Sequence, residues 1–317
     1  MILKPDDLDW RGLVSPLSAA DDALARLDER LRTSPYAEGW RARMDFREAA
    51  AALWLTGDLV DLDALVLRDQ NMDGQRPTLD VLRAQSVLWT RRRLSRLAAP
   101  LTRDNVIRLV GDDLRVAASV CDDSDSFRPD YGSERRDLDL WLRQTEHFGD
   151  CPPVLAAAAA WALWSAINPL PRAPWMGPQL AAWRLHRRGR AHAHLPALAL
   201  GLRLSRSAAA GRPPRRPSDS LNELVLSVEK AAHAGLDQLN RLSLAAEILL
   251  RRAGAETRRS RLSDLVDLAL REPLVTVPLI ARRLKISQQA AQSLVSRAGS
   301  SLRELSGRDR YRAWAIL

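Results

Sequence analysis

Apolar residues recur at helical spacing along most of this chain. Ser18 and Asp21 have the pattern of a helix start, and Leu24, Leu27 and Leu31 follow three to four residues apart, on one face of a helix. Similar patterns predict further helices at about 38–56, 62–68, 77–98, 103–120, 134–147, 153–166, 177–188, 195–206, 221–253 and 260–271. The chain is therefore predicted to be all-α, with a multi-helix N-terminal bundle.

The breaks in this pattern separate the predicted elements. Gly57 is expected to end the second helix, and the acidic, turn-rich stretch 122–132 is expected to be an exposed loop. The apolar run Val154–Ile167 is interrupted only by Ser165. It is shorter than the roughly 20 residues that span a bilayer, which predicts a buried core helix and no membrane partner.

Residues 207–220 (SAAAGRPPRRPSDS) have the composition of a Pro/Arg-rich linker, because Pro213 and Pro214 cannot sit inside a helix. We therefore predict three parts. Residues 1–206 form a helical scaffold for an effector or for dimerisation, 207–220 form the linker, and 221–317 form a helical connector followed by a DNA-binding domain.

The net charge of +9 is unevenly distributed. Residues 1–150 hold 22 Arg/Lys against 28 Asp/Glu, residues 151–250 hold 12 against 5, and residues 251–317 hold 14 against 6. The first part is therefore acidic, and the end of the chain is the most basic. A concentrated basic segment is typical of a surface that binds a polyanion, although an Arg-rich solvated surface gives the same count.

The basic end contains the pattern of a helix-turn-helix. Thr276 is expected to cap a first helix whose inner face holds Ile280, Ala281 and Leu284, and Pro278 is tolerated in its first turn. Lys285 and Ile286 make the turn, with Ile286 as its buried plug. Glycine often stands where Lys285 stands, so a left-handed turn here costs about 1–2 kcal/mol.

Ser287 is expected to cap the second helix, in which Ala291, Leu294, Val295 and Ala298 share the inner face. We expect base reading from Ser287, Gln288, Gln289, Gln292 and Ser293, because glutamine can pair bidentately with adenine. We expect backbone contacts from Arg282, Arg283, Lys285, Ser296 and Arg297. The alternative is an ordinary pair of short helices in a bundle.

The C-terminal tail has the pattern of a small β-wing. Residues 306–309 (SGRD) are expected to turn between two short strands, with Tyr311, Trp314 and Ile316 lining the second. Arg308, Arg310 and Arg312 would then lie beside the DNA backbone. A charged amphipathic tail without a DNA role is the alternative.

Three segments carry a resemblance to a known family: 40–69 (WRARMDFREAAAALWLTGDLVDLDALVLRD), 174–190 (PWMGPQLAAWRLHRRGR) and 279–299 (LIARRLKISQQAAQSLVSRAG). The chain resembles plasmid-borne proteins of rhizobia, of uncharacterised function, that end in a helix-turn-helix DNA-binding domain. The resemblance covers most of the chain and implies DNA binding without implying a mechanism.

A second resemblance is to the Fic fold of AMP-transferases, whose members often carry a C-terminal winged helix. Asn168-Pro169-Leu170 stands near the place of that family's catalytic His-Pro-Phe, and no Gly-Asn-Gly-Arg loop follows. That chemistry needs the histidine as a base, so the resemblance implies a scaffold without the enzyme. We expect no catalytic residue and no cofactor. His192 and His194 lack further ligands nearby, so we expect no metal site.

The function predicted from the sequence is specific binding of double-stranded DNA by a cytoplasmic homodimer. Transcriptional regulation of plasmid or mobile-element genes is the expected role. Cytoplasmic location is inferred from an N-terminus without a secretory pattern and from two distant cysteines, Cys121 and Cys151. The alternatives are a nucleotide transferase on a Fic-like scaffold, and a toxin–antitoxin-like module that binds a protein partner through its acidic N-terminal half.

Overall fold

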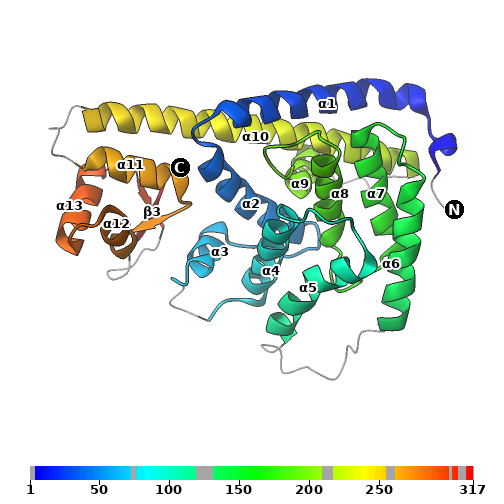
Figure 1. The fold of residues 1–317 in the computed structure, drawn as a ribbon, viewed down its shortest axis with the longest axis horizontal. Coiled ribbons are helices and arrows are strands. Elements are labelled where there is room, and N and C mark those ends of the chain that lie inside the picture. Colours follow the sequence, from blue (N-terminus) through cyan, green and yellow to red (C-terminus); the bar gives the residue numbers. More distant parts are fainter. Residues whose placement is uncertain are drawn as a thin grey trace.

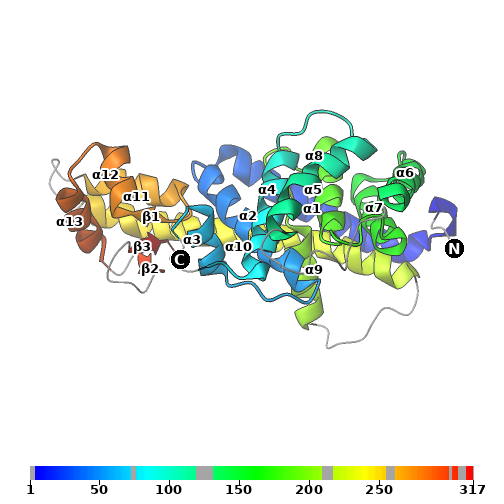
Figure 2. The same cartoon turned by 90° about the horizontal axis from the view of Figure 1, so that it is seen from below.

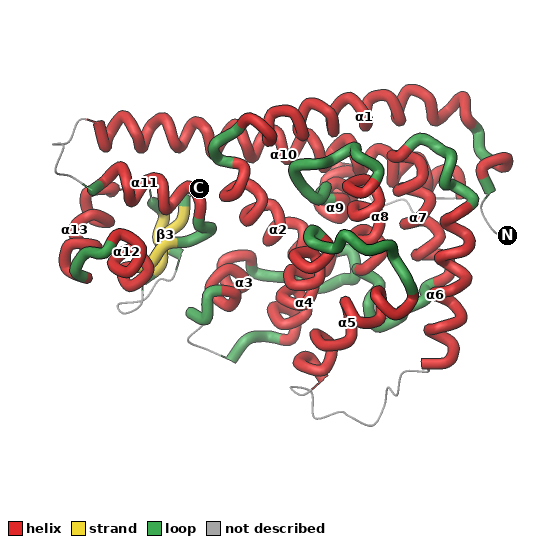
Figure 3. The backbone as a smooth tube through the Cα atoms, in the orientation of Figure 1, coloured by secondary structure: helices red, strands yellow, loops and turns green. Residues whose placement is uncertain are grey.

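The structure is a computed structural model that describes residues 4–72, 76–118, 131–208, 217–254, 261–299, 302–305 and 312–316. Within these residues the chain is all-α apart from a three-stranded sheet near the C-terminus (Figures 1 and 3). Its helices are α1 (Trp10–Thr33), α2 (Ala37–Trp54), α3 (Leu62–Asp69), α4 (Leu79–Leu94), α5 (Arg103–Ala118), α6 (Tyr131–Glu146), α7 (Pro153–Ile167), α8 (Met176–Arg187), α9 (Leu198–Ala208), α10 (Pro217–Gly254), α11 (Leu262–Arg271), α12 (Val277–Leu284) and α13 (Gln288–Ala298). A short 3-10 helix, Pro5–Asp7, precedes α1.

Helix α10 connects the two parts of the molecule. Its 38 residues span about 57 Å. It packs against α1, α7 and α9 in the N-terminal bundle, and against α11 in the C-terminal part. Figures 1 and 2 show α10 running along the bundle and beyond it, with α11–α13 gathered beside its far end.

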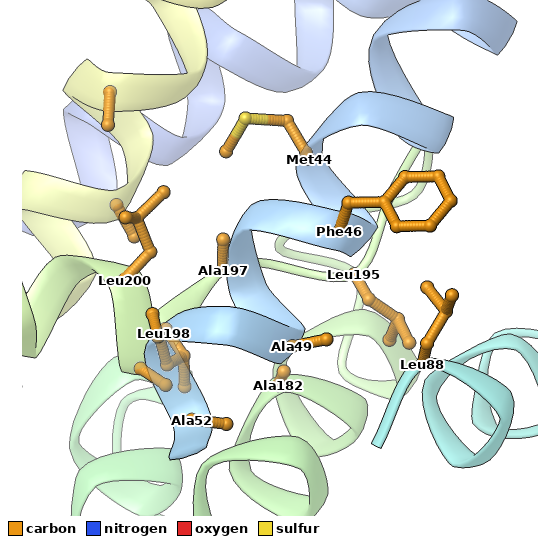
Figure 4. Packing of buried hydrophobic residues seen from close by; sticks show 14 of the residues in the cluster. Met44, Phe46, Ala49, Ala52, Leu88, Ala182, Leu195, Ala197, Leu198 and Leu200 are labelled. Atoms are coloured by element: carbon orange, nitrogen blue, oxygen red, sulfur yellow. The ribbon is translucent and has the colours of Figure 1, made fainter. Parts of the chain in front are cut away.

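The bundle buries its apolar residues around α2 and α7. The Ala-rich helix α7 is buried along almost its whole length, and Trp164 of α7 meets Trp141 of α6 edge-on at 5.3 Å between ring centroids. Figure 4 shows apolar side chains of α2, among them Phe46 and Ala49, packed with residues of α4, α8 and α9. These contacts join segments far apart in the sequence into one core.

Most of the predicted helices are present within a few residues of their predicted bounds. Helix α2 ends as expected just before Gly57, which has a φ of 96° that a side chain would disfavour. The apolar run at 154–167 forms the buried helix α7, as predicted. Among the described residues, no helix has the length and apolar character needed to cross a membrane, and no cluster of His, Cys, Asp and Glu suits a metal ion.

The predicted start of the first helix at Ser18 is wrong. Helix α1 begins at Trp10, after Asp9, whose carboxylate accepts from the Gly12 N–H at 3.4 Å. Pro16 lies inside the helix, where it removes one backbone hydrogen bond. The helix continues through it because α1 packs along α10 and buries Leu13. Tertiary packing here outweighs a local helix breaker.

Three other boundaries differ from the prediction. Helix α4 ends at Leu94 and not at residue 98, and the Ser95 hydroxyl donates to the Arg92 carbonyl at this end. Gly132 lies in α6, whereas the rest of the predicted loop, up to Asp130, lies outside the described residues. Both ends of the predicted linker are helical: 207–208 end α9 and 217–220 begin α10, with Pro217 at the first position, where its missing N–H costs nothing. Residues 209–216 lie outside the described part.

The sheet has one strand more than predicted. Strands β2 (Arg303–Glu304) and β3 (Ala313–Ala315) pair antiparallel as expected, and β1 (Val275–Thr276) pairs with the other edge of β3. The order is therefore β1-β3-β2. Because β1 directly precedes α12, the sheet fixes the tail to the start of the helix-turn-helix. The predicted turn at 306–309 lies outside the described residues.

Candidate nucleic-acid interface

Helix α12 begins and packs as its sequence predicts. The Thr276 hydroxyl accepts from the Leu279 N–H at 3.2 Å, and Pro278 occupies the first turn. Ile280 and Leu284 are buried, and Ala281 is half-buried. Arg282 and Arg283 are exposed, on the part of the helix turned away from the core. The cap and the apolar face together orient α12 so that Arg282 and Arg283 lie in solvent.

The turn after α12 is left-handed at Lys285, with φ 53° and ψ 51°. The Lys285 and Ile286 N–H groups both donate to the Ala281 carbonyl, which closes the end of the helix. Lysine has a Cβ, so this conformation costs about 1–2 kcal/mol that glycine would avoid. The lysine side chain is exposed beside the second helix. Ile286, the predicted plug, is half-buried against the core.

Helix α13 separates its faces as expected. The Ser287 hydroxyl accepts from the Ala290 N–H at 3.1 Å and caps the helix. The buried face consists of Ala291, Leu294, Val295 and Ala298, and the exposed face of Gln288, Gln289, Gln292, Ser293, Ser296 and Arg297. Figures 1 and 2 both show α13 at the end of the molecule farthest from the bundle. An exposed polar helix at one end of an elongated protein can enter a DNA groove.

The charge around this helix favours an anion. The sequence has no Asp or Glu between Glu272 and Glu304, a stretch that holds α12 and α13. The same stretch carries Arg282, Arg283, Lys285, Arg297 and Arg303, all exposed. A stretch of sequence that holds five cations and no carboxylate attracts phosphate at long range.

The other predicted backbone contacts have different surroundings. Arg283 lies 3.3 Å from Glu272, and the Ser296 hydroxyl donates to the Gln292 carbonyl at 3.1 Å. Arg312 pairs with Glu304 and lies over the Trp314 ring at 5.5 Å from its centroid. Arg308 and Arg310 lie outside the described residues. The structure thus brings the residues of α12 and α13 together, and it places Arg312 in an ion pair of the sheet.

The helix-turn-helix is fixed to the bundle by α2, a contact that the sequence did not reveal. Arg43 is buried and donates to the carbonyls of Ala269, Leu270 and Glu272 at 2.8–3.0 Å, where α11 ends. Burial lowers the pKa of Arg43 to about 10, so it stays charged at neutral pH. A Cβ on Gly39 would lie 1.8 Å from the Leu270 carbonyl oxygen, so the two helices touch through their backbones.

Two exposed arginines add contacts that were also missed. Arg303 of β2 makes a two-oxygen contact with Asp63 of α3 at 2.9 and 3.1 Å, and Arg252 of α10 donates to the Ala298 carbonyl at 2.9 Å. The partners are 240 and 46 residues apart, so sequence spacing gives no signal for either pair. These contacts hold α13 in one orientation relative to the bundle.

Comparison with known families and proteins agrees with this architecture. Residues 127–254 match the family described as "Protein of unknown function (DUF1612)", and residues 262–317 match the family described as "HTH DNA binding domain". The chain is also similar to the uncharacterized protein y4cF of Sinorhizobium fredii, with 30% identity over 375 aligned residues that cover 96% of this chain and 97% of the relative. The predicted resemblance to a rhizobial family is thereby confirmed: the chain carries a C-terminal helix-turn-helix DNA-binding domain and belongs to the same family as y4cF.

Proposed function

We propose that this protein binds specific double-stranded DNA sequences and regulates transcription, with α13 in the major groove. The observation that carries the proposal is the division of α13 into a buried apolar face and an exposed face of glutamine and serine. A helix with this division supplies hydrogen-bond donors and acceptors to base edges while its apolar side keeps it seated. The genes of a plasmid or mobile element are the proposed targets.

The exposed residues then have two roles. In this proposal Ser287, Gln288, Gln289, Gln292 and Ser293 read the bases, because they are exposed at the start and along the outer face of α13. Arg282, Lys285 and Arg297 contact phosphates on either side of it, and Ser296 and Arg283 assist them. Arg283 has to leave Glu272 to do so, so its contribution is smaller than that of Arg282. Arg308, Arg310 and Arg312 of the tail complete the proposed backbone contacts.

We propose a homodimer as the binding species. One recognition helix covers few base pairs, and helix-turn-helix proteins commonly pair two half-sites about one helical turn apart. The bundle and α10 offer the surface for this pairing, and the acidic residues 1–150 offer a surface for a protein partner. Light scattering on the DNA complex tests the dimer, and one protein chain per bound site would contradict it.

The function is tested by a salt-dependent titration of the full-length chain against fragments of its own upstream region. We expect preference for one fragment and a log–log salt slope of about −0.9 per phosphate contact. Gln292→Ala should cost about 1–3 kcal/mol on the preferred fragment and little on random DNA. Arg282→Ala should weaken binding to the preferred fragment and to random DNA equally. It should also make the log–log salt slope less steep by the value of about one phosphate contact.

Matched controls come from exposed residues remote from α13. Asn240→Ala on α10 removes an exposed amide, and Arg26→Ala on α1 removes an arginine paired with Asp22. Neither should change the affinity for DNA. If Gln292→Ala weakened specific and random DNA equally, the reading face would be misplaced. Binding without preference for any sequence would contradict the regulatory role.

We further propose that the bundle is a scaffold and not a nucleotide transferase. Asn168, which stands where the Fic resemblance requires a histidine, is left-handed with φ 51° and caps the end of α7. An amide has no basic nitrogen to accept a proton from a target hydroxyl. A rise in Tm on adding ATP with Mg²⁺ that Asn168→Ala abolished would overturn this assignment.

A further inference from the structure

A cavity lies in the bundle where four segments meet. Its volume is about 230 Å³, and it is lined by residues of α2, the end of α4, the end of α8 and the loop that joins α8 to α9. No residue of the helix-turn-helix lines it. The DNA-binding role therefore leaves this cavity unexplained.

The side chains around the cavity are mostly cationic or hydrogen-bond donors. Arg41, Arg91 and Asp45 line it together with three imidazoles, those of His186, His192 and His194. Arg91 is 1% exposed and is fixed by the Asp45 carboxylate at 2.6 Å and by the Gln179 side chain at 3.2 Å. Asp45 pairs with Arg91, and the Asp28 carboxylate lies 3.3 Å from His192 and 3.5 Å from His194, so Arg41 is the lining cation that can meet an anion.

Arg41 lines this cavity and keeps hydrogen-bond donors available for a ligand. Its Nη1 donates to the Ala193 carbonyl at 3.0 Å, and its side chain is exposed. This single bond orients the planar guanidinium group while leaving further N–H donors for another acceptor. Arginine in this state is suited to a two-point contact with a carboxylate or a phosphate.

His194 adds a buried polar atom. Its side chain is 2% exposed, and its Nδ1 lies 3.5 Å from the Asp28 carboxylate. Among the described residues, no group makes a hydrogen bond to its Nε2. Burial lowers the pKa of His194, so the ring is neutral at neutral pH and that nitrogen can donate or accept according to its tautomer. The ring packs edge-on against Trp40 at 5.3 Å between centroids, so His194 shapes the wall of the cavity, and Arg41 is the donor exposed to a ligand.

We propose that this cavity binds a small organic oxyanion, a carboxylate or a phosphate, through Arg41 and the imidazoles around it. A volume of about 230 Å³ lies just below the range of about 300–1,000 Å³ that is usual for ligand pockets, so the cavity suits a small ligand. Trp40 and Leu195 supply an apolar wall, so the ligand carries a short apolar stem beside its charged group.

The position of the cavity connects it to DNA binding, a step that rests on the proposed function. Trp40, Arg41 and Asp45 line the cavity from α2. Gly39 and Arg43 of the same two turns hold the end of α11, one turn before the helix-turn-helix. A ligand that shifts α2 therefore acts directly on the contact that orients α12 and α13. The oxyanion is thus an effector of DNA affinity.

Binding is tested with two probes, inorganic phosphate and succinate, each titrated into the millimolar range by calorimetry on the full-length protein. Sodium chloride at equal ionic strength is the control for unspecific salt effects. We expect a saturable heat with one of the two probes, which tells phosphate from carboxylate ligands. The same probe should raise the Tm by about 5 °C at roughly a hundred times its Kd. No saturable heat with either probe would overturn the proposal.

Substitutions of single arginines test whether the probe binds at Arg41. Arg41→Gln should weaken the binding of the probe by about tenfold to a hundredfold, since a charged hydrogen bond is lost, and Arg41→Lys should restore part of it. Arg26→Gln on α1, an exposed arginine outside the cavity, should bind as the unaltered protein does. If Arg282→Gln removed the binding and Arg41→Gln did not, the anion would occupy the DNA-binding face, and the proposal would be wrong.

The coupling is measured by repeating the DNA titration with the probe at saturation. We expect the Kd for DNA to change by at least about fivefold, and DNA to change the Kd of the probe by the same factor. Arg41→Gln should abolish the change while leaving DNA binding without the probe intact. An unchanged Kd for DNA would overturn the effector role. A protein that binds the probe and no DNA would instead refute the proposed function and leave the site standing.

Discussion

The helix-turn-helix and the N-terminal bundle are stabilised in different ways. In the helix-turn-helix, Thr276 and Ser287 each cap a helix by accepting from an N–H three residues later. In the bundle, Glu48 is fully buried and accepts from the N–H groups of Ala199 and Leu200, 151 and 152 residues away. The two helices of the first region are capped by local contacts and expose their polar face, whereas the second region buries groups such as Glu48 and pairs them across the chain.

Because of this difference, substitutions in α13 and substitutions in the bundle should affect stability and DNA binding to different extents. A polar group on α13 is solvated, so replacing it costs little stability and removes only the contact to DNA that we propose for it. A buried group such as Glu48 or Arg91 in the bundle has several partners, so replacing it leaves those partners buried and unpaired. Four predictions, from the largest expected effect to the smallest, follow from this contrast.

Arg91→Ala should produce the largest loss of stability. Arg91 is 1% exposed and donates to Asp45, to Gln179 and to the carbonyls of Leu195 and Pro196. Removing one partner of a buried ion pair costs about 3–5 kcal/mol in the free energy of unfolding. Urea denaturation measures this loss. Arg26→Ala, in an exposed pair with Asp22, should cost at most about 1 kcal/mol. Similar losses in both variants would remove the contrast.

Gly39→Ala should destabilise the contact between the two regions. Its Cβ would lie 1.8 Å from the Leu270 carbonyl oxygen, so α2 and α11 have to separate, at a cost of about 1–3 kcal/mol. DNA affinity should fall as well, because α11 carries the helix-turn-helix. Gly111→Ala in α5 is the matched control: its Cβ meets nothing within 4 Å, and we expect a gain of about 0.5–1 kcal/mol. A neutral Gly39→Ala would show that the regions do not depend on this contact.

His194 should make stability depend on pH. Burial lowers its pKa below that of the unfolded chain, about 6.5, so below that pH the unfolded state takes up the proton first. The free energy of unfolding is therefore flat above about pH 6.5 and falls by at most about 1.4 kcal/mol per pH unit below it.

Denaturation at pH 7 and pH 5 should show this fall in the unaltered protein and in His192→Gln, whose side chain is 65% exposed, and not in His194→Gln. Asp28 does not contribute in this range. Burial raises the pKa of Asp28, but hydrogen bonds from His194 and the Ala193 N–H lower it by more, so the net shift is downward. The stability that Asp28 contributes is therefore lost only below about pH 4. An equal slope in His194→Gln would assign the pH dependence to another group.

Lys285→Gly should have the smallest effect on stability and should separate it from DNA binding. Glycine removes about 1–2 kcal/mol of left-handed strain, part of which is offset by the greater freedom of the unfolded chain. We expect a net gain of up to about 1 kcal/mol by urea denaturation. DNA binding should weaken on all sequences, with one phosphate contact fewer in the salt slope. A loss of stability would mean that the lysine side chain makes a folded-state contact that outweighs its strain.

The sequence by itself determined the parts that depend on neighbouring residues. The helical class, the end of α2 at Gly57, the caps Thr276 and Ser287, and the two faces of α13 all follow from spacings of a few residues. Such signals are local because a cap or an i, i+4 face is complete within one or two turns. The exposure of the polar residues of α13 was therefore predicted correctly, and their role in DNA binding is the proposal that the experiments test.

Tertiary structure alone decided the features that join distant segments. It carried α1 through Pro16, because α10 covers that helix, and it added β1 to the sheet through its pairing with β3. It also placed Arg43 against the end of α11, more than two hundred residues away. No spacing in the sequence predicts these contacts, because each partner's position depends on how the whole bundle packs. The same is true of the cavity beside α2, whose lining comes from four separate segments.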